Sequence, residues 1–338
     1  MTDEVILQVK DLRTYFYTDA GVVKAVDGLT FDLHKGETLG LVGESGSGKS
    51  VTNLSVIKLI QTPPGKIEGG EVLFNGEDLL KMSDARLREI RGDRIAMIFQ
   101  DPMSSLNPYL RISTQMIETI CLHQGLNKKA AKEKAIEMLK LTGIPAAEKR
   151  IDGYPHQFSG GMRQRVMIAM GLSCNPDILI ADEPTTALDV TIQAQILDLM
   201  QDLTHRLGTA VILITHSLGV VAGVCDTIVV MYAGRIVERG TTEDIFYDTK
   251  HPYTQGLIKS VPRLDRDDED RLFSIEGQPP NVVDLPDCCP FYPRCHKALP
   301  VCKNRYPPVV RFSDTHCAAC WLYAQKDGGT FTAEDTTK

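Results

Sequence analysis

Short apolar runs separated by turns occupy the first 80 residues of the chain. They include Val5-Ile6-Leu7, Thr30-Phe31-Asp32-Leu33 and Gly70-Glu71-Val72-Leu73-Phe74. Apolar runs of this length, rich in β-branched and aromatic residues, predict strands. The last run is followed by Asn75-Gly76, the dipeptide that favours a tight hairpin turn.

Helical spacing replaces this pattern from about residue 83 to residue 150. Ala135, Met138 and Leu139 recur at i, i+3 and i+4 within Lys- and Glu-rich sequence, which predicts an amphipathic surface helix. Strand-like and helix-like segments alternate again from about residue 160 to residue 240. This alternation predicts an α/β domain with a largely parallel sheet.

One largely apolar stretch, residues 209–234, has the length of a membrane span. Its β-branched residues fall into two blocks, 211–214 and 228–231, and it contains His216 and Asp226. We therefore predict two buried strands that flank a short helix, and no membrane span.

The composition of the sequence changes after about residue 255. Residues 263–271 form a mixed-charge run, which predicts a solvated linker or helix. A Pro-rich and Cys-rich segment follows. We divide the chain into a core of residues 1–255, an extension of residues 256–322 and a polar, disordered tail of residues 323–338.

The composition is that of a soluble globular protein, with 43% hydrophobic and 24% charged residues in a chain of 338. The net charge is −7 and there is no basic tail, so a nucleic-acid partner receives no electrostatic support. The N-terminus lacks the basic-then-apolar order of a secretory signal, from which we expect a cytosolic location.

A phosphate-binding motif occupies residues 43–50, which read Gly-Glu-Ser-Gly-Ser-Gly-Lys-Ser. An apolar strand-like run precedes it, and apolar residues at helical spacing follow over residues 51–60. Strand, glycine loop and helix together direct backbone N–H groups at a phosphate, so the motif predicts a nucleoside triphosphate site. Lys49 would bridge the β- and γ-phosphates, and Ser50 would ligate Mg²⁺. The other binding residues of the loop are Gly43, Ser45, Gly46 and Gly48.

Two further strand ends carry polar side chains. The run Ile178-Leu179-Ile180-Ala181 ends in Asp182-Glu183, where Asp182 would hold Mg²⁺ and Glu183 would polarise the attacking water. His216 ends the next strand. A lone histidine there is commonly structural, but parallel strands end at one sheet edge, which favours a γ-phosphate contact.

A second helix start suited to an anion lies at Ser159-Gly160-Gly161-Met162-Arg163-Gln164. The plain alternative is a simple N-cap.

In this order the motifs resemble the ATPase subunit of ATP-binding cassette (ABC) transporters. The resemblance covers about residues 5–255. The signature at residues 159–164 is preceded by Phe158 and contains Met162, where the commonest form has Leu and Gln. The remaining family positions are Gln100 after the strand Ile95-Ala96-Met97-Ile98-Phe99, and the Ala187-Leu188-Asp189 loop.

The resemblance implies a phosphate-loop core with a β-subdomain and a helical subdomain, the latter at about residues 101–170. It also implies a head-to-tail dimer with two ATPs at its interface, each closed by Ser159, Gly160 and Gly161 of the opposite subunit. Gln100 would contribute to catalysis and to the Mg²⁺ site. Phe16 would stack on adenine, with Tyr17 as a near rival.

Narrower features are similar to the dipeptide and oligopeptide importers. They are residues 100–108, Tyr154-Pro155-His156-Gln157, His251-Pro252-Tyr253-Thr254 and Pro293-Arg294-Cys295. This resemblance implies an ATPase that energises peptide import from the cytoplasmic face of the inner membrane. Its partners would be a related second ATPase subunit in a heterodimer, two membrane permease subunits and an extracytoplasmic peptide-binding protein.

Residues 101–125 would then face the membrane subunits. Met103, Leu106 and Tyr109 are the apolar side chains expected at that contact. The alternative is that they belong to the core of the helical subdomain.

Six of the nine cysteines crowd into the extension. The spacing C-x5-C-x6-C-x17-C runs through Cys289, Cys295, Cys302 and Cys320, and the resemblance implies a [4Fe-4S] cluster on them. Structural Zn²⁺ is the second interpretation and free thiols are the third. Cys288 and Cys317 are additional, which leaves the ligand set open. The remaining cysteines, Cys121, Cys174 and Cys225, are expected to be core residues.

Other functions remain open at this stage. One is a non-transport cassette ATPase that acts in DNA repair or translation, against which the acidic balance and the importer motifs argue. Another is an importer ATPase for a different solute, such as a metal chelate. The third, an iron–sulfur redox protein that merely binds nucleotide, leaves the signature and His216 unexplained.

Overall fold

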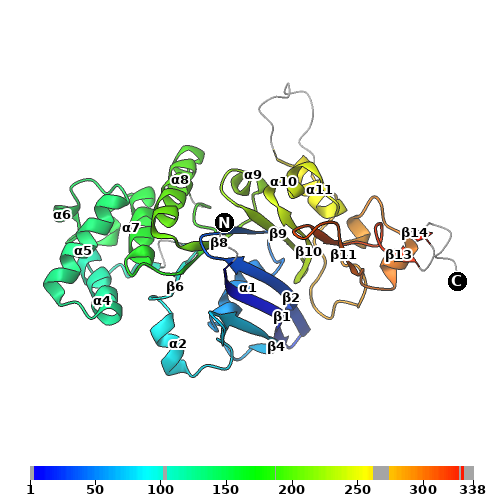
Figure 1. Ribbon diagram of the computed structural model, residues 1–338, viewed down its shortest axis with the longest axis horizontal. Helices are drawn as coiled ribbons and strands as arrows, with labels where there is room; N and C mark the ends of the chain where they lie inside the picture. Colours follow the sequence, from blue (N-terminus) through cyan, green and yellow to red (C-terminus); the bar gives the residue numbers. More distant parts are fainter. Residues whose placement is uncertain (1–3, 102–104, 187, 262–273, 327–328, 331–338) are drawn as a thin grey trace. The chain divides into compact units, whose positions relative to one another are not determined.

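The computed structural model describes residues 4–101, 105–186, 188–261, 274–326 and 329–330 (Figure 1). The chain forms two compact units, each assembled from segments that are distant in sequence. Unit 1 contains residues 1–7, 33–38 and 78–214, and unit 2 contains residues 8–32, 39–77 and 215–338.

Unit 1 contains three parallel strands. They are β6 (Ile95–Ile98), β7 (Ile178–Asp182) and β8 (Ala210–Thr215), in the order β6-β7-β8. Every residue of β7 and β8 is buried, because a parallel sheet covered on both faces requires continuous apolar strands. β6 ends one residue before the predicted boundary, and Phe99 is exposed.

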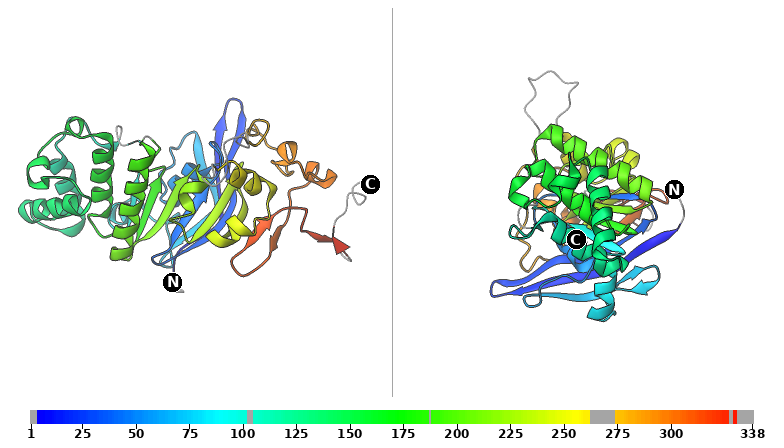
Figure 2. Two further views of the ribbon diagram at one scale, coloured as in Figure 1. Left: turned by 90° about the horizontal axis from the view of Figure 1, so that it is seen from above. Right: turned by 90° about the vertical axis from the view of Figure 1, so that its left-hand side faces the viewer.

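Helices surround these strands. α7 (Gly160–Leu172) packs directly on the sheet, since a Cβ on Gly171 would lie 3.4 Å from Leu179 and 3.5 Å from Ile98. The other helical segments of unit 1 are α2 (Asp84–Ile90), α4 (Ile112–Gln124), α5 (Lys128–Leu141), α6 (Ala147–Arg150), η1 (Pro155–Gln157) and α8 (Val190–Leu207). Helices α4, α5 and α7 pack against one another, and they form a cluster with α6 in Figures 1 and 2.

The predicted amphipathic helix is α5. Its buried residues are Ala131, Ala135, Met138 and Leu139, which confirms the prediction from spacing. Asn127 begins the helix by accepting hydrogen bonds from the N–H groups of the first turn.

Unit 2 contains an antiparallel sheet and the phosphate loop. The sheet strands are β2 (Gly21–His34), β1 (Val5–Thr18), β4 (Gly65–Phe74) and β5 (Glu77–Asp78), in that spatial order. The hairpin predicted at Asn75-Gly76 is confirmed, since both residues have positive φ (48° and 84°) between β4 and β5. α1 (Lys49–Val56) is shorter than its apolar spacing predicted, because Lys58 adopts the left-handed conformation, with φ of 53°.

The remaining strands of unit 2 belong to a second sheet. β3 (Thr38–Val42) pairs in parallel with β9 (Thr227–Tyr232), and β10 (Arg235–Thr241) pairs antiparallel with β9. The extension continues this sheet, since β12 (Cys317–Ala319) pairs with β10 and β11 (Val309–Arg311) pairs with β12. Main-chain hydrogen bonds therefore attach the C-terminal segment to the sheet of residues 1–255.

Short helices complete unit 2. They are α9 (Leu218–Val221), α10 (Thr242–Tyr247), α11 (Pro252–Lys259), η2 (Tyr292–Arg294) and η3 (Pro300–Lys303). The apolar stretch 209–234 forms β8, α9 and β9, as predicted. Within the ranges that the structure describes, none of the helices has the length and apolar character needed to cross a membrane.

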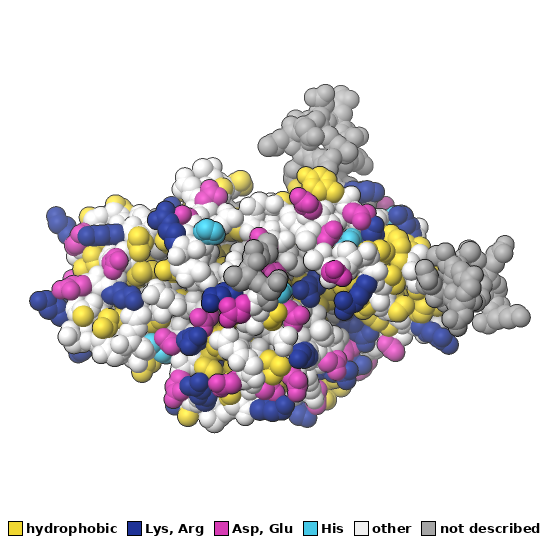
Figure 3. All heavy atoms as spheres, in the orientation of Figure 1, with side chains coloured by type: hydrophobic (Ala, Val, Ile, Leu, Met, Phe, Trp, Pro, Cys, Tyr) yellow, Lys and Arg dark blue, Asp and Glu magenta, His cyan; other side chains and the backbone are white. Residues whose placement is uncertain are grey.

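The end of the chain is described only in part. β13 (Gln325–Lys326) and β14 (Gly329–Thr330) pair within the segment for which the sequence predicts disorder. Residues 331–338 and the mixed-charge run 263–271 lie outside the described residues. On the face drawn in Figure 3, acidic and basic side chains are interspersed, in keeping with 37 Lys and Arg against 44 Asp and Glu.

Candidate functional site: an ATPase centre

The phosphate loop connects β3 to α1 and is packed tightly against its surroundings. A Cβ on Gly43 would lie 2.3 Å from the Met231 carbonyl oxygen, and one on Gly48 would lie 2.2 Å from that of Ala25. Gly48 also has φ of 102°, a conformation that other residues rarely adopt. Close backbone contacts therefore exclude a side chain at Gly43 and at Gly48.

The Gly48 geometry gives a stability prediction. Gly48→Ala is expected to lower the free energy of unfolding by about 2 kcal/mol and to weaken ATP binding, because Cβ meets backbone at a strained φ. Thermal denaturation and ATP titration check this. Gly46→Ala is the matched control, since Gly46 has φ of 80° but nothing within 4 Å of its Cβ position. Equal losses in both variants would contradict the role given to the contact.

Lys49 begins α1 and is only 5% exposed. Its ammonium donates hydrogen bonds to the carbonyl oxygens of Gly43 (2.7 Å) and Glu44 (2.9 Å), and to Ser47 Oγ (3.4 Å). The cation is thus held across the loop by the loop's own acceptors. Ser50, the predicted Mg²⁺ ligand, is the second residue of the same helix.

The acidic pair lies at the end of β7. Asp182 is the buried last residue of the strand, and Glu183 follows with φ of 45°. Glu183 Oε2 accepts hydrogen bonds from Gln100 Nε2 (3.0 Å) and from Thr186 Oγ1 (2.8 Å). Two residues predicted to act together, Gln100 and Glu183, are therefore in direct contact, and strained backbone of this kind concentrates at functional sites.

The signature motif forms the N-terminus of α7. Ser159 is its N-cap, and its Oγ accepts from Met162 N (3.4 Å). An open hollow of about 490 Å³ lies here, lined by Ser159, Gly160, Gly161, Leu188, Asp189 and Ile192. A Cβ on Gly161 would lie 3.1 Å from Ile192, so a side chain there would intrude on the wall of the hollow. Ala187 of the adjacent loop lies outside the described residues.

Comparison with known proteins places these motifs in a family. The ABC transporter family model matches residues 26–186, and the model for the oligopeptide/dipeptide transporter C-terminal region matches residues 237–302. The chain is 53% identical to the oligopeptide transport ATP-binding protein OppD of Bacillus subtilis, covering 94% of this chain and 88% of that protein. It is 52% identical to the dipeptide transport ATP-binding protein DppD of the same organism, covering 96% of each.

The chain belongs to the ATP-binding proteins of peptide ABC transporters. Solved structures agree on the fold. A dimeric post-hydrolysis state of the ATP-binding cassette MJ0796, bound to ADP and Pi, matches with a TM-score of 0.62 and 27% identity over 70% of this chain and 98% of that one. CbiO1 from Clostridium perfringens matches with a TM-score of 0.61 and 29% identity, over 73% and 93%. The α/β nucleotide-binding fold predicted from the motifs is confirmed.

Other predicted residues of this peptide transporter ATPase lie in unit 2. Phe16 is half-buried on β1, and a Cβ on Gly65 of β4 would approach its ring within 3.0 Å. Tyr17 is more exposed and donates its hydroxyl to Glu68 Oε1 (2.6 Å). His216 is an exposed residue directly after β8. Phe16, His216 and the phosphate loop belong to unit 2, whereas Gln100, Ser159, Asp182 and Glu183 belong to unit 1.

Two residues in contact with the phosphate loop were missed by sequence reasoning. Tyr253 Oη accepts a hydrogen bond from Glu44 N (2.9 Å), and Arg294 forms an ion pair with the Glu44 carboxylate. Both occur in motifs that were interpreted only as marks of the importer branch. The signal available in the sequence was His251-Pro252, a helix start that carries Tyr253 in its first turn.

His251 gives a pH prediction for this ATPase. It is buried and caps α11 by accepting at Nδ1 from Tyr253 N (3.1 Å), and burial lowers its pKa from 6.5 to about 3. The folded protein therefore keeps His251 neutral while the unfolded chain protonates it, so its contribution is complete above pH 6.5 and falls as the pH drops towards 3. Between pH 7 and pH 5 the wild type should lose about 2 kcal/mol more stability than His251→Asn, which can cap but does not titrate.

Denaturant unfolding of both proteins at several pH values measures this difference. Parallel pH profiles for the two would contradict it. The absolute stability of the variant does not enter the comparison, because only the slopes are compared.

The late cysteines lie near one another. Burial, and after it the nearby Cys302, Cys320 and Cys295 thiols, raise the pKa of Cys289 to about 12. Burial likewise raises the pKa of Cys320, to about 11. Thiol donors suit iron or zinc, but within the described ranges no group of three or more His, Cys, Asp or Glu side chains is arranged to hold a metal ion. None of the nine cysteines forms a disulfide. Cys174 and Cys225 are buried as predicted, whereas Cys121 is only partly buried.

Proposed function

We propose that this chain hydrolyses MgATP and thereby energises the import of dipeptides and oligopeptides through an ABC transporter. The observation that carries the proposal is the Glu183 carboxylate, held beside the end of β7 by Gln100 and Thr186. The relatives at 53% and 52% identity are named as oligopeptide and dipeptide transport ATP-binding proteins, which supports the peptide substrate.

Each residue then has a defined task. The loop N–H groups and Lys49 bind the phosphates, and Phe16 stacks on adenine. Mg²⁺, when bound by Ser50, Gln100 and Asp182, neutralises charge on the phosphates. Glu183 orients the attacking water and accepts its proton, and His216 donates a hydrogen bond to the γ-phosphate. Ser159, Gly160 and Gly161 complete the site of the opposite subunit.

The family supports a proposal for the assembly. The core of residues 1–255 pairs with a second, related ATPase subunit at the cytoplasmic face of the inner membrane, beneath two permease subunits fed by a peptide-binding protein. In segment 101–125, Tyr109 is 87% exposed and suits a permease contact. Leu106 is 1% exposed and is a core residue, so it does not take part in that contact. Met103 lies outside the described residues.

The cysteine cluster is a separate part of the proposal. Cys289, Cys295, Cys302 and Cys320 would bind a [4Fe-4S] cluster, with Zn²⁺ as the alternative. The support is their spacing and the hydrogen bond that Cys289 N donates to the Cys302 carbonyl oxygen (3.0 Å), although the described side chains are not arranged around a metal ion. Anaerobically purified protein should contain iron and acid-labile sulfide in equal amounts. Zinc alone would support the alternative, and neither metal would leave free thiols.

The test of function is purification with partners. We expect hydrophobic membrane subunits to co-purify with the chain, and the ATPase activity of the complex to rise when peptide-loaded binding protein is added. Co-purification of ribosomes or DNA instead would support a non-transport cassette ATPase. Stimulation by a metal chelate, but not by peptides, would change the solute.

A further inference from the structure

One arginine of the extension forms an ion pair with the phosphate loop. Arg294, at the end of η2, pairs with Glu44 in two-point fashion, with Nη1 to Oε2 at 2.6 Å and Nη2 to Oε1 at 3.0 Å. The Arg294 side chain is 5% exposed. A two-point guanidinium–carboxylate pair removed from water is both stronger and more directional than a surface ion pair.

Arg294 is held in place by two carbonyl groups of the extension and by Tyr232 of β9. Nε donates to the Glu276 carbonyl (3.1 Å), Nη2 donates to the Ile275 carbonyl (3.2 Å), and Nη1 donates to Tyr232 Oη (3.3 Å). Its guanidinium is therefore fixed before Glu44 is considered. The adjacent residue in sequence is Cys295, one of the clustered thiols.

Glu44 connects Arg294 to the other contacts of the phosphate loop. Its carbonyl oxygen accepts from Lys49 Nζ (2.9 Å) and its N–H donates to Tyr253 Oη (2.9 Å), while its carboxylate meets Arg294. Glu44 also carries the only carboxylate of residues 43–50. Without Arg294, an uncompensated negative charge would stand in the loop that binds phosphates.

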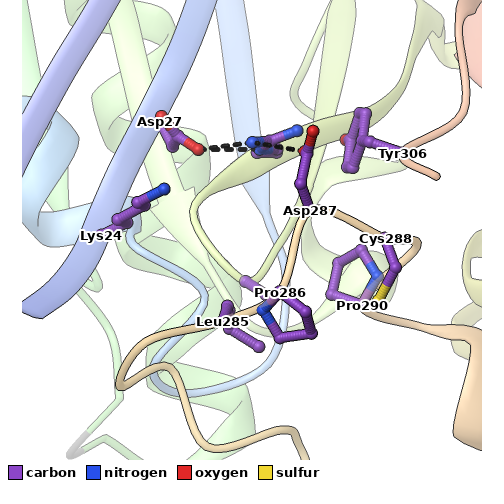
Figure 4. Close-up of a pocket in the computed structure, with 10 residues that line it drawn as sticks. Lys24, Asp27, Leu285, Pro286, Asp287, Cys288, Pro290 and Tyr306 are labelled. Atoms are coloured by element: carbon purple, nitrogen blue, oxygen red, sulfur yellow. Dashed lines mark hydrogen bonds and ion pairs between the residues drawn. The ribbon is translucent and has the colours of Figure 1, made fainter. Parts of the chain in front are cut away.

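A second anchor attaches the extension to β10 independently of Arg294 (Figure 4). Arg235 of β10 pairs with Asp27 of β2 (Nε 3.0 Å and Nη2 2.6 Å), and its guanidinium lies 4.0 Å from the centre of the Tyr306 ring. Asp287 lies 3.6 Å from the same guanidinium. The pairing of β12 with β10 adds main-chain hydrogen bonds. Loss of Arg294 alone should therefore leave the extension attached.

We propose that Arg294 is a positioning residue for the phosphate loop, which makes the nucleotide affinity of the ATPase depend on the C-terminal extension. Arg294 neutralises Glu44 and fixes the backbone segment whose carbonyl holds Lys49. This inference rests on the proposed function, because it assumes that the loop binds ATP.

The experiment is MgATP titration of the full-length chain, with KM and kcat measured on the assembled transporter. Arg294→Ala should weaken ATP binding about tenfold and raise KM similarly, with kcat little changed, because a charge-assisted pair is lost outside the reacting atoms. Arg294→Lys should lose less affinity than Arg294→Ala but more than the wild type, since an ammonium keeps the positive charge and cannot form the two-point pair. Arg311→Ala, an exposed arginine of the extension, is the matched control and should bind ATP as the wild type does.

A rescue separates this role from a merely structural one. In a Glu44→Gln background, Arg294→Ala should cost little further affinity, because the charge that it compensates is gone. An equal loss in both backgrounds, or wild-type affinity of Arg294→Ala, would overturn the inference. Lys49→Ala in the same titration distinguishes a failure of this inference from a failure of the proposed function. If it loses affinity while Arg294→Ala does not, only this inference fails, and if it binds normally, the proposed function itself fails.

Discussion

Glu183→Gln is expected to lower the ATP turnover of the assembled transporter by about 10²–10⁴-fold, equivalent to about 3–5 kcal/mol of activation free energy. The amide keeps the size of the side chain and its acceptance of hydrogen bonds from Gln100 and Thr186. It cannot accept the proton of the attacking water. ATP binding should therefore persist while hydrolysis is lost.

Steady-state phosphate release and ATP titration together measure this separation. Glu133→Gln, which changes an exposed glutamate of α5, is the matched control for the replacement of a carboxylate by an amide. This variant should hydrolyse ATP at the wild-type rate. Near-normal turnover of Glu183→Gln would remove Glu183 from the role of base. A parallel loss of ATP binding would instead make it a binding residue.

Lys49→Ala should weaken ATP binding by about 10²-fold and abolish peptide uptake. The ammonium is the buried cation of the loop, and it is already aligned by the Gly43 and Glu44 carbonyls. Its removal deletes the charge-assisted contacts to the triphosphate and leaves those carbonyl oxygens facing the phosphates.

Titration of the full-length chain and uptake of labelled peptide by cells that carry the variant check this expectation. Lys128→Ala, an exposed lysine at the start of α5, controls for the loss of one positive charge. Undiminished affinity together with normal uptake would contradict the proposed function as a whole.

The structure confirms several predictions that depended on local sequence. The hairpin at Asn75-Gly76, the amphipathic face of α5 and the two buried strands at 209–234 each follow from spacing or from a turn dipeptide. The boundaries were less exact, as the early ends of α1 and β6 illustrate. Burial of Leu106 could not be read from a short apolar loop, because its exposure depends on which helices cover it.

The extension marks the limit of sequence reasoning. Its cysteine spacing was visible, but its attachment was not. Arg294 and Glu44 are separated by 250 residues, and the local sequence of neither residue predicts its contact with the other. Similarly, β12 joins β10 only because the last part of the chain returns to the sheet edge.

The chemistry of this protein is predictable from contiguous motifs: a phosphate loop, a strand that ends in Asp182-Glu183, and a signature helix. The function of each follows from backbone geometry and residue type. The contacts that support this chemistry are visible only in the folded chain. Gln100 meets Glu183, Tyr253 meets the backbone of Glu44, and Arg294 meets its carboxylate. The physical reason is that hydrogen bonds and ion pairs depend on distance in space, which chain folding sets independently of distance along the sequence.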